Sequence, residues 1–344
     1  MRKACLDMVF ELAKRDERVL FVGSDLGHGT LDEFRQTLPD RFLMEGISEM
    51  NVVGLAAGFA MEGSVPYVNT IATFLTRRCY EQVAMDVCHA NLPVRLIGNG
   101  GGLVYAPLGP THEAIDDIAI MRALPNMTIV APADADEMRR FMRVSVDHDG
   151  PIYIRLAKGY DPIVTDSSND FEIGAAVSMR EGTDALLVTT GIGLRICLEA
   201  AEALAARHID VGVLHLPTIK PLDVDALISR VEGVSVVVSV EEHSIIGGLG
   251  SAIAELIAEA SFDVPKRFRR IGVPDAYPHQ YGSQASQLEH FGITPLGVAE
   301  TVESLATRRH RPQVHARARN QGGIKWDNSK TSSPPYTRGQ PGIV

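Results

Sequence analysis

Two kinds of hydrophobic pattern alternate along most of the chain. Short, continuous apolar runs predict buried strands, and longer segments with apolar positions three or four residues apart predict helices. In the first half we expect strands at 19–23, 65–69, 94–97 and 152–155, and helices at 4–12, 48–61, 77–89 and 133–146. In the second half we expect strands at 185–189, 211–214, 234–240 and 268–272, and helices at 193–207, 222–231 and 248–260. Such alternation is typical of α/β folds built on doubly wound, mostly parallel sheets.

The pattern is interrupted by a polar stretch at 161–169, which contains Asp-Pro and Ser-Ser-Asn and indicates a linker. A chain of 344 residues is long enough for two such domains, each with its own core. We therefore predict one doubly wound domain at 1–165 and a second at 170–305. The remaining 306–344 is rich in Arg, Gln, Gly, Ser and Pro, and is predicted to be disordered.

Composition narrows the class of protein. The net charge of -10 argues against nucleic acid or an anionic membrane as a general partner. The longest apolar run, 52–61, is shorter than the roughly 20 residues that a membrane helix needs. Met1-Arg2-Lys3 begins like a signal peptide, but charged residues interrupt the segment that follows. Four cysteines without a Cys-x-x-Cys pair indicate reduced thiols and a cytoplasmic location.

Glu49 is the first candidate for chemistry, because the segment 44–51 places it at the start of an apolar helix. A structural role explains it simply, since Ser48 can cap the helix and an acid in the first turn favours the helix dipole. Gly54 and Gly58 add a second interpretation, because they let the helix pack against something bulky. These residues alone name no cofactor.

A histidine and an aromatic residue are the next candidates. The run Gly109-Pro110-Thr111-His112 predicts a tight turn that fixes the position of its histidine. Phe74 lies in the run 70–78, where the alternatives are a ring that packs in the core and a ring that stacks on a flat ligand.

Together, Gly46-Ile47-Ser48-Glu49-Met50 and Gly109-Pro110-Thr111-His112 resemble two motifs of the thiamine-diphosphate-dependent transketolase family. The resemblance implies that Glu49 hydrogen-bonds N1′ of the aminopyrimidine and stabilises the imino tautomer, whose 4′-nitrogen removes the C2 proton of the thiazolium. It implies that His112 lies near the reacting carbon, where it moves protons or orients substrate hydroxyls. Glu49 and His112 are thus the expected catalytic residues.

The resemblance also implies further contacts to the cofactor. Phe74 is expected to stack on the pyrimidine ring, and Ile71 stands where transketolases have a second phenylalanine. Ile47 is expected beside the cofactor, and Asp25 matches an aspartate that lies close to the thiazolium.

The substrate contacts depart from the family pattern. The resemblance implies a phosphate-binding role for Arg155, with help from Arg2 and Lys158, although Arg2 is equally explained as a solvated terminus. Leu108 replaces the usual aspartate, and the region from Asn99 replaces a substrate-facing histidine. We therefore expect a ketose other than a standard pentose phosphate, with a sulfonate as the alternative anion.

The second half continues the resemblance. Residues 241–250 and 271–275 are similar to the C-terminal domain of transketolases, whose main role is to support the dimer. His243 is therefore expected to be structural. The glycine-rich turns here lack the G-x-G-x-x-G spacing of a dinucleotide-binding motif.

The sequence contains no Gly-Asp-Gly, the family's mark of the domain that holds the diphosphate and a divalent ion. We therefore predict a partner subunit that carries this domain and most of the Mg²⁺ site, in a heterotetramer. The expected reaction transfers a two-carbon ketol unit from a ketose, or ketose phosphate, to an aldehyde.

Three alternatives remain open. A deoxyxylulose-phosphate-synthase-like activity is suggested by 241–250, and the β subunit of a 2-oxo acid dehydrogenase shares the layout. The Gly-Pro-Thr-His turn and the following 116–119 favour the transketolase side. A scaffold without catalysis is disfavoured by the presence of Glu49, Phe74 and His112 together.

Overall fold

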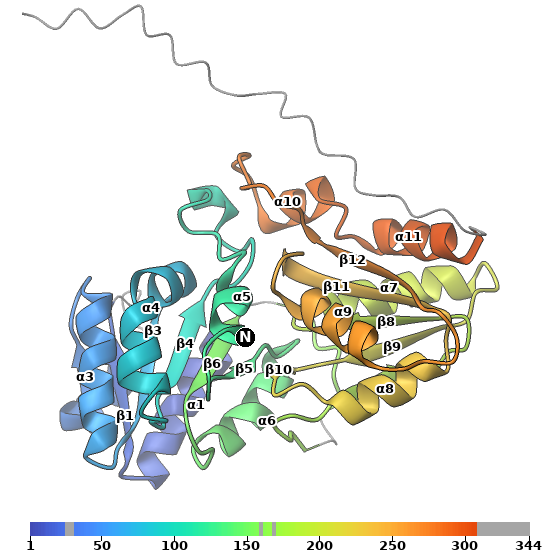
Figure 1. Cartoon of the computed structure of the whole chain (residues 1–344). Helices are drawn as coiled ribbons and strands as arrows, with labels where there is room; N and C mark the ends of the chain where they lie inside the picture. The colour runs from blue at the N-terminus through green and yellow to red at the C-terminus, as the bar shows by residue number, and fades with distance from the viewer. Residues whose placement is uncertain (25–30, 158–160, 167–169, 308–344) are drawn as a thin grey trace, which may run out of the picture. The chain divides into compact units, whose positions relative to one another are not determined.

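The computed structural model describes residues 1–24, 31–157, 161–166 and 170–307, and Met1–Thr307 forms one compact unit. Two sheets organise these residues (Figure 1). The first has the strand order β10-β5-β6-β4-β3-β1-β2. Its strands are β1 (Val19–Gly23), β2 (Phe42–Met44), β3 (Val65–Ile71), β4 (Arg95–Asn99), β5 (Thr128–Val130), β6 (Ile152–Leu156) and β10 (Thr218–Lys220).

The central strands of the first sheet are parallel and buried on both faces. Every residue of β1, β4 and β6 is buried, which is why β1 is a continuous apolar run and why β4 and β6 are apolar except at Arg95, Asn99 and Arg155. The exception to the parallel order is β10, which comes from the second half of the chain and pairs antiparallel with β5 at the edge.

Two groups of helices cover the first sheet. On one side α1 (Arg2–Arg15) and α6 (Ala135–Ser145) share a hydrophobic cluster with residues of β1 and β6. A second cluster contains the buried side of α3 (Glu49–Met61), together with residues of α5 (Asp117–Arg122). Shorter elements are α2 (Asp32–Thr37), α4 (Tyr80–Gln82), and the 3₁₀ turns η1 (Pro39–Arg41) and η4 (Ala106–Leu108).

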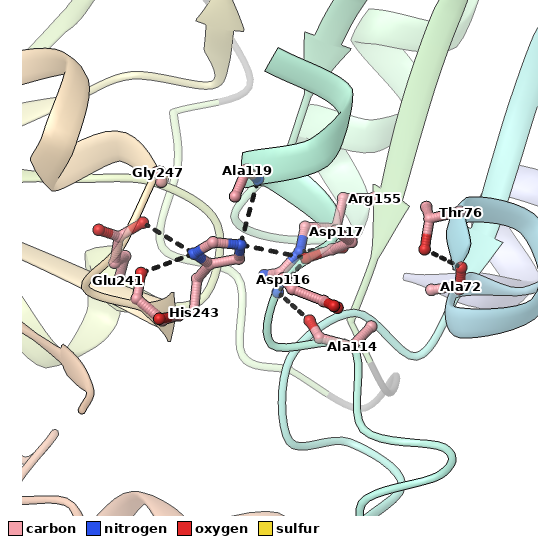
Figure 2. Close-up of polar contacts among 12 residues, drawn as sticks. Ala72, Thr76, Ala114, Asp116, Asp117, Ala119, Arg155, Glu241, His243 and Gly247 are labelled. Atoms are coloured by element: carbon pink, nitrogen blue, oxygen red, sulfur yellow. Dashed lines mark hydrogen bonds and ion pairs between the residues drawn. The ribbon is translucent and has the colours of Figure 1, made fainter. Parts of the chain in front are cut away.

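The segment predicted as one helix at 77–89 is interrupted, and the single-helix prediction is wrong. It consists of a π-helical turn η2 (Phe74–Arg78), the short α4 and a second π-helical turn η3 (Val83–Cys88). In the first of these turns, the Thr76 hydroxyl donates to the carbonyl of Ala72, as Figure 2 shows, and Cys79 Sγ donates to the carbonyl of Phe74. These side-chain bonds compete with the regular helical ladder. π-Helical turns of this kind are frequent at functional sites.

The second sheet has the order β12-β11-β8-β9-β7, and only β7 runs antiparallel to its neighbour. Its strands are β7 (Val177–Arg180), β8 (Ala185–Thr189), β9 (Val211–His215), β11 (Val236–Ser244) and β12 (Arg267–Val273). Its helices are α7 (Gly193–Ala205), α8 (Val224–Glu232), α9 (Leu249–Glu259), α10 (Gln284–His290) and α11 (Pro295–Thr307). The predicted α/β class with two mostly parallel sheets is confirmed.

The boundary between the halves in sequence is not a boundary in space. Because β10 joins the first sheet, the chain crosses back after β9, and Ala131 also donates its N–H to the carbonyl of Pro217. The division into 1–165 and 170–305 stays a prediction.

All four cysteines are buried and free, as expected for reduced thiols. Among the described residues no helix is both long and apolar enough to cross a membrane. The cytoplasmic location stays a prediction.

Candidate active site

The candidate site lies where the parallel strands of the first sheet end. Ser24, directly after β1, donates from its hydroxyl to Thr70 Oγ1 at 2.6 Å. One strand further, Asn69 of β3 and Asn99 of β4 exchange two hydrogen bonds between their amides, at 3.3 and 3.1 Å. In open α/β sheets this carboxyl edge is the usual place for ligands.

Glu49 is the first residue of α3 and is 3% exposed. Its side chain does not cap the helix: Glu49 Oε2 accepts a hydrogen bond from Arg78 Nη1 at 2.6 Å. The Arg78 side chain is 42% exposed, so one end of this ion pair is buried and the other reaches solvent. Ser48 precedes the helix without a capping hydrogen bond from its side chain. Ser48 therefore does not cap the helix through its side chain, whereas Glu49 does lie in the first turn, where an acid favours the helix dipole.

An aromatic group continues from this ion pair. The guanidinium carbon of Arg78 lies 4.5 Å from the centroid of the Phe74 ring. The Phe74 ring contacts His112 edge to face, with centroids 5.2 Å apart and planes at 66°. Tyr105 approaches the same histidine at 6.5 Å. The structure thus brings three predicted residues, Glu49, Phe74 and His112, into one continuous group.

The two predicted isoleucines occupy different surroundings. Ile47 is 80% exposed in the turn before α3, and Ile71 is half-buried at the end of β3, three residues before Phe74. Asn99 is buried and its amide is bonded to Asn69.

Arg155 is buried and makes several polar contacts inside the protein (Figure 2). Arg155 Nε lies 2.7 Å from Asp117 Oδ2, and Arg155 Nη2 donates to the carbonyls of Ala114 and Glu242. Tyr153 donates its hydroxyl to the same oxygen of Asp117 at 2.7 Å. Burial opposes the charge of Asp117, but the Arg155 guanidinium keeps the pKa of this carboxyl below its usual value. Through these contacts Arg155 neutralises the buried Asp117 and binds backbone carbonyls from both halves of the chain. Its role as a phosphate ligand stays a prediction.

Arg2 is placed differently. It is half-buried and its guanidinium has neither a hydrogen bond nor an ion pair within the described part of the chain. It lines a cavity of about 250 Å³ together with Gly100, Tyr105, Leu108 and Ala157. Tyr105 therefore contacts two predicted parts of the site: it lines this cavity together with Arg2, and its ring lies near that of His112. Of the two predicted arginines, Arg2 has the guanidinium available to an anion.

Two predicted site residues cannot be placed. Asp25 and Lys158 lie outside the described residues. Among the residues that are described, no cluster of His, Cys, Asp and Glu could hold a metal ion.

Several residues of the site were missed in the sequence. Arg78 could have been found, because it lies four positions after Phe74 and such residues share a helix face. Asp117, 0% exposed beside Arg155, and the wholly buried Glu113 next to His112 gave no comparable signal, because their importance depends on burial.

Known families account for both halves of the chain. The model of the transketolase pyrimidine-binding domain matches residues 1–160, and that of the transketolase C-terminal domain matches residues 174–298. The chain is 33% identical over 311 residues to the 6-deoxy-6-sulfo-D-fructose transketolase subunit of Clostridium sp. (strain MSTE9), covering 90% of this chain and 95% of that protein.

Two further comparisons give the range of relatives. The 1-deoxy-D-xylulose-5-phosphate synthase of Symbiobacterium thermophilum is 37% identical over 93% of this chain, which spans 49% of that enzyme's length. A solved structure described as a split gene transketolase, inactive beta4 tetramer, has 34% identity and a TM-score of 0.82, covering 89% of this chain and 98% of that one. The chain therefore belongs to the transketolase family of thiamine-diphosphate-dependent transferases, and its relatives include a subunit of a split transketolase that it matches over nearly the whole length.

Proposed function

We propose that this chain is the pyrimidine-binding subunit of a split transketolase, which transfers a two-carbon ketol unit from an anionic ketose to an aldehyde. The observation that carries the proposal is the continuous group of Glu49, Arg78, Phe74 and His112 at the carboxyl edge of the first sheet. A buried acid, a flat ring and a histidine are the groups that an aminopyrimidine and a reacting carbonyl require.

These residues fit the pyrimidine ring of thiamine diphosphate. The carboxylate of Glu49 is buried, and Arg78, which binds it, has a side chain that is 42% exposed and also lies over the Phe74 ring. Arg78 can therefore turn toward solvent and leave Glu49 for a ring nitrogen. Phe74 supplies a face for stacking.

The chemistry divides between cofactor and protein. Thiamine diphosphate, when bound, would supply a nucleophilic C2 carbon for the ketose carbonyl, after transfer of the C2 proton to its own 4′-nitrogen. Glu49 holds N1′ in the tautomer that this proton transfer needs, and a general acid–base step of this kind contributes about 10²–10⁴-fold. His112 lies at the edge of Phe74 and orients the substrate hydroxyls or moves their protons.

Arg2 is the residue that we assign to the substrate's anion. Arg2 lines the cavity beside Leu108 and Tyr105, and its guanidinium is unpaired among the residues that the structure describes. A guanidinium binds either a phosphate or a sulfonate by two parallel hydrogen bonds. The Clostridium relative is described as acting on a sulfo sugar, which supports an anion other than phosphate. We accordingly propose a ketose whose anionic group lies far from its carbonyl.

A partner subunit completes the proposed enzyme. The sequence has no Gly-Asp-Gly for the diphosphate and Mg²⁺, so we assign both to the partner. The face of α3 next to Glu49 is suited to receive it. Along this face, at helical spacing, lie exposed Met50 and Met61, and a Cβ added at Gly54 or Gly58 would meet nothing within 4 Å. Exposed Ile47 lies in the turn just before the helix. A contiguous exposed apolar face of this kind marks an interaction surface.

The proposal is tested by reconstitution. The chain alone, with thiamine diphosphate and Mg²⁺, should show neither ketol transfer nor exchange of the C2 proton, and addition of the partner should supply both. The partner is sought as a co-purifying chain that carries Gly-Asp-Gly. Turnover of ketoses by the purified chain without a second protein would contradict the proposal.

A second function is favoured by one finding, the 37% identity to a deoxyxylulose-phosphate synthase. The same reconstituted complex distinguishes the two, since it can be assayed for formation of 1-deoxy-D-xylulose 5-phosphate as well as for ketol transfer. We expect formation of 1-deoxy-D-xylulose 5-phosphate to be negligible beside ketol transfer.

A further inference from the structure

The end of β11 forms hydrogen bonds to the loop that carries His112, although β11 belongs to the second sheet. Two hydrogen bonds between Gly102 and Ala114, of 3.0 and 2.9 Å, close the segment 103–113 into a loop. We call Gly102, Leu103, Ala114 and Ile115 the neck of this loop. Ser244, the last residue of β11, donates its N–H to the carbonyl of Ile115 at 2.8 Å.

Glu242 makes the central contact to this neck. Its Oε1 accepts the N–H of Leu103 at 2.9 Å and the side-chain amide of Gln284, in α10, at 2.8 Å. Its own carbonyl accepts from Arg155 Nη2 at 2.9 Å, and that nitrogen also binds the carbonyl of Ala114. Glu242 therefore contacts one strand of the neck directly and the other through Arg155.

The backbone of the neck is shaped for this carboxylate. Gly102 has a φ of +69°, and a Cβ there would lie 2.5 Å from Glu242 Cδ and 2.7 Å from the Glu242 carbonyl. Glycine is required both by the backbone conformation and by the close approach. Glu242 is 4% exposed, so the acceptor that it offers to Leu103 is not replaced by bulk water.

A neighbouring residue on β11 contacts α5, the helix that follows the loop (Figure 2). His243 Nδ1 lies 2.7 Å from the carbonyl of Ser244, and its Nε2 accepts the N–H of Ala119 at 3.3 Å, in the first turn of α5. Three consecutive residues of one strand thus bind backbone groups before and after His112.

We propose that Glu242 is a positioning residue, which fixes His112 at the site by holding the neck of its loop. The proposal assigns the second half of the chain a direct part in the active site, and its kinetic consequence rests on the function proposed above. Glu242 does not touch the substrate. It acts by limiting where His112 can lie, and a misplacement of about 1 Å at such a group costs about 10²-fold in rate.

The structural part is tested on the chain alone by amide hydrogen exchange. In Glu242→Ala, exchange within 103–113 should accelerate about 10- to 100-fold, because a buried backbone donor loses its acceptor. Glu242→Gln retains Oε1 and should keep the slow exchange. Asp223→Ala is the matched control, since the Asp223 carboxylate likewise accepts backbone N–H groups, here from Ala176 and Ala226, but lies away from the neck. Unchanged exchange in Glu242→Ala would overturn the proposal.

The catalytic part is tested in the complex by a double-mutant cycle. Glu242→Ala should lower kcat about 10²-fold with KM nearly unchanged, and Glu242→Gln should restore kcat. In a His112→Ala background, Glu242→Ala should have almost no further effect, because the residue it positions is gone. Additive losses would show that Glu242 acts otherwise. If His112→Ala alone left turnover intact, the role of His112 in the proposed function would fail, whereas the exchange experiment would still decide whether Glu242 holds the loop.

Discussion

Two glutamates close to the site are buried in different ways. Glu49 accepts a hydrogen bond from Arg78, whose exposed side chain can be displaced. Glu113, next to His112, is 0% exposed, and neither of its carboxylate oxygens has a hydrogen-bond donor within the described part of the chain. The first is an ion pair that a ligand can replace. The second is a carboxyl group for which the neutral form is favoured by burial.

Glu49→Gln should separate catalysis from assembly. Glutamine keeps the shape but loses the charge-assisted hydrogen bond to N1′. We expect C2-proton exchange of thiamine diphosphate in the reconstituted complex to slow by about 10²–10⁴-fold, while partner binding is unchanged. Glu45→Gln, an exposed glutamate in the same segment, is the control. Wild-type exchange in Glu49→Gln would show that the catalytic assignment is wrong.

Glu113 should make the stability of the protein depend on pH. Burial raises the pKa of its carboxyl from 4.5 to about 7 in the folded state. Between these two values the folded chain binds more protons than the unfolded chain. The contribution of Glu113 to the free energy of unfolding therefore falls as pH rises from about 4.5 to about 7, and is then constant.

The variant Glu113→Gln should remove this dependence. Relative to wild type it should gain on the order of 3 kcal/mol between pH 4 and pH 8, from a shift of roughly 2.5 pH units. Denaturant titrations at both pH values measure the difference. The exposed Glu300→Gln is the control and should follow the wild-type curve. Burial also raises the pKa of Glu242 to about 7, so Glu242 should account for any pH dependence of stability that remains in Glu113→Gln. A wild-type slope in Glu113→Gln would contradict the assignment.

Substitution of Arg2 should affect catalysis, whereas substitution of Arg155 should affect folding stability. Arg2→Ala should lower kcat/KM about 10- to 100-fold for ketoses that carry a phosphate or sulfonate, the loss expected for a hydrogen bond to a charged group, and leave neutral ketoses unaffected. Lys3→Ala, which removes a neighbouring exposed cation, is the control. Arg155→Ala should instead cost about 3–5 kcal/mol of folding stability, because Asp117 is left buried and unpaired. Equal losses on neutral and anionic ketoses in Arg2→Ala would exclude the anion role.

At the scale of elements, α3 has a buried side and an apolar exposed side. Val52, Val53, Ala56 and Ala57 pack inside, and the opposite side contains Gly54 and Gly58 between exposed methionines. A surface helix usually carries polar residues there. Glycine in a helix interior also costs about 1 kcal/mol relative to alanine, so its presence at two open positions needs a reason. Close contact with a partner supplies one.

Gly58→Leu tests this interpretation. The isolated chain should become slightly more stable, by up to about 1 kcal/mol, because leucine favours the helix and meets open space. Binding of the partner should weaken, because the added side chain fills the surface on which it docks. Thermal unfolding of the isolated chain is thus an internal control for the binding measurement. Undiminished association would show that the partner docks elsewhere.

Elements with a strong hydrophobic pattern were predictable from the sequence. The predicted strands 19–23 and 185–189 have the bounds of β1 and β8, because fully buried strands are continuous apolar runs. The three-residue strands β5 and β10 are too short for such a pattern. The prediction of a single helix at 77–89 was wrong because hydrophobic spacing does not indicate π-helical turns or the hydrogen bond from the Thr76 hydroxyl to the Ala72 carbonyl.

The site was predictable only where a motif carried it. Glu49 and His112 lie in motifs, and the structure places them in one group through Phe74 and Arg78. The ion pair between Arg155 and Asp117 could not be predicted from the sequence, because the two residues are 38 positions apart and only the fold brings them together. The same holds for Glu242 and Leu103, 139 positions apart.

At the scale of the whole molecule, the crossing strand β10 limits how this chain can be divided in evolution or in the laboratory. A gene fragment that encodes only 1–165 would contain all strands of the first sheet except β10, the strand that pairs with β5 at the edge. The exposed edge of Thr128–Val130 would then offer unpaired backbone groups to any neighbouring chain. Such a fragment should associate or precipitate, whereas 1–307 should remain monodisperse in sedimentation. We therefore expect a functional recombination point between the two halves to carry 218–220 with the first half.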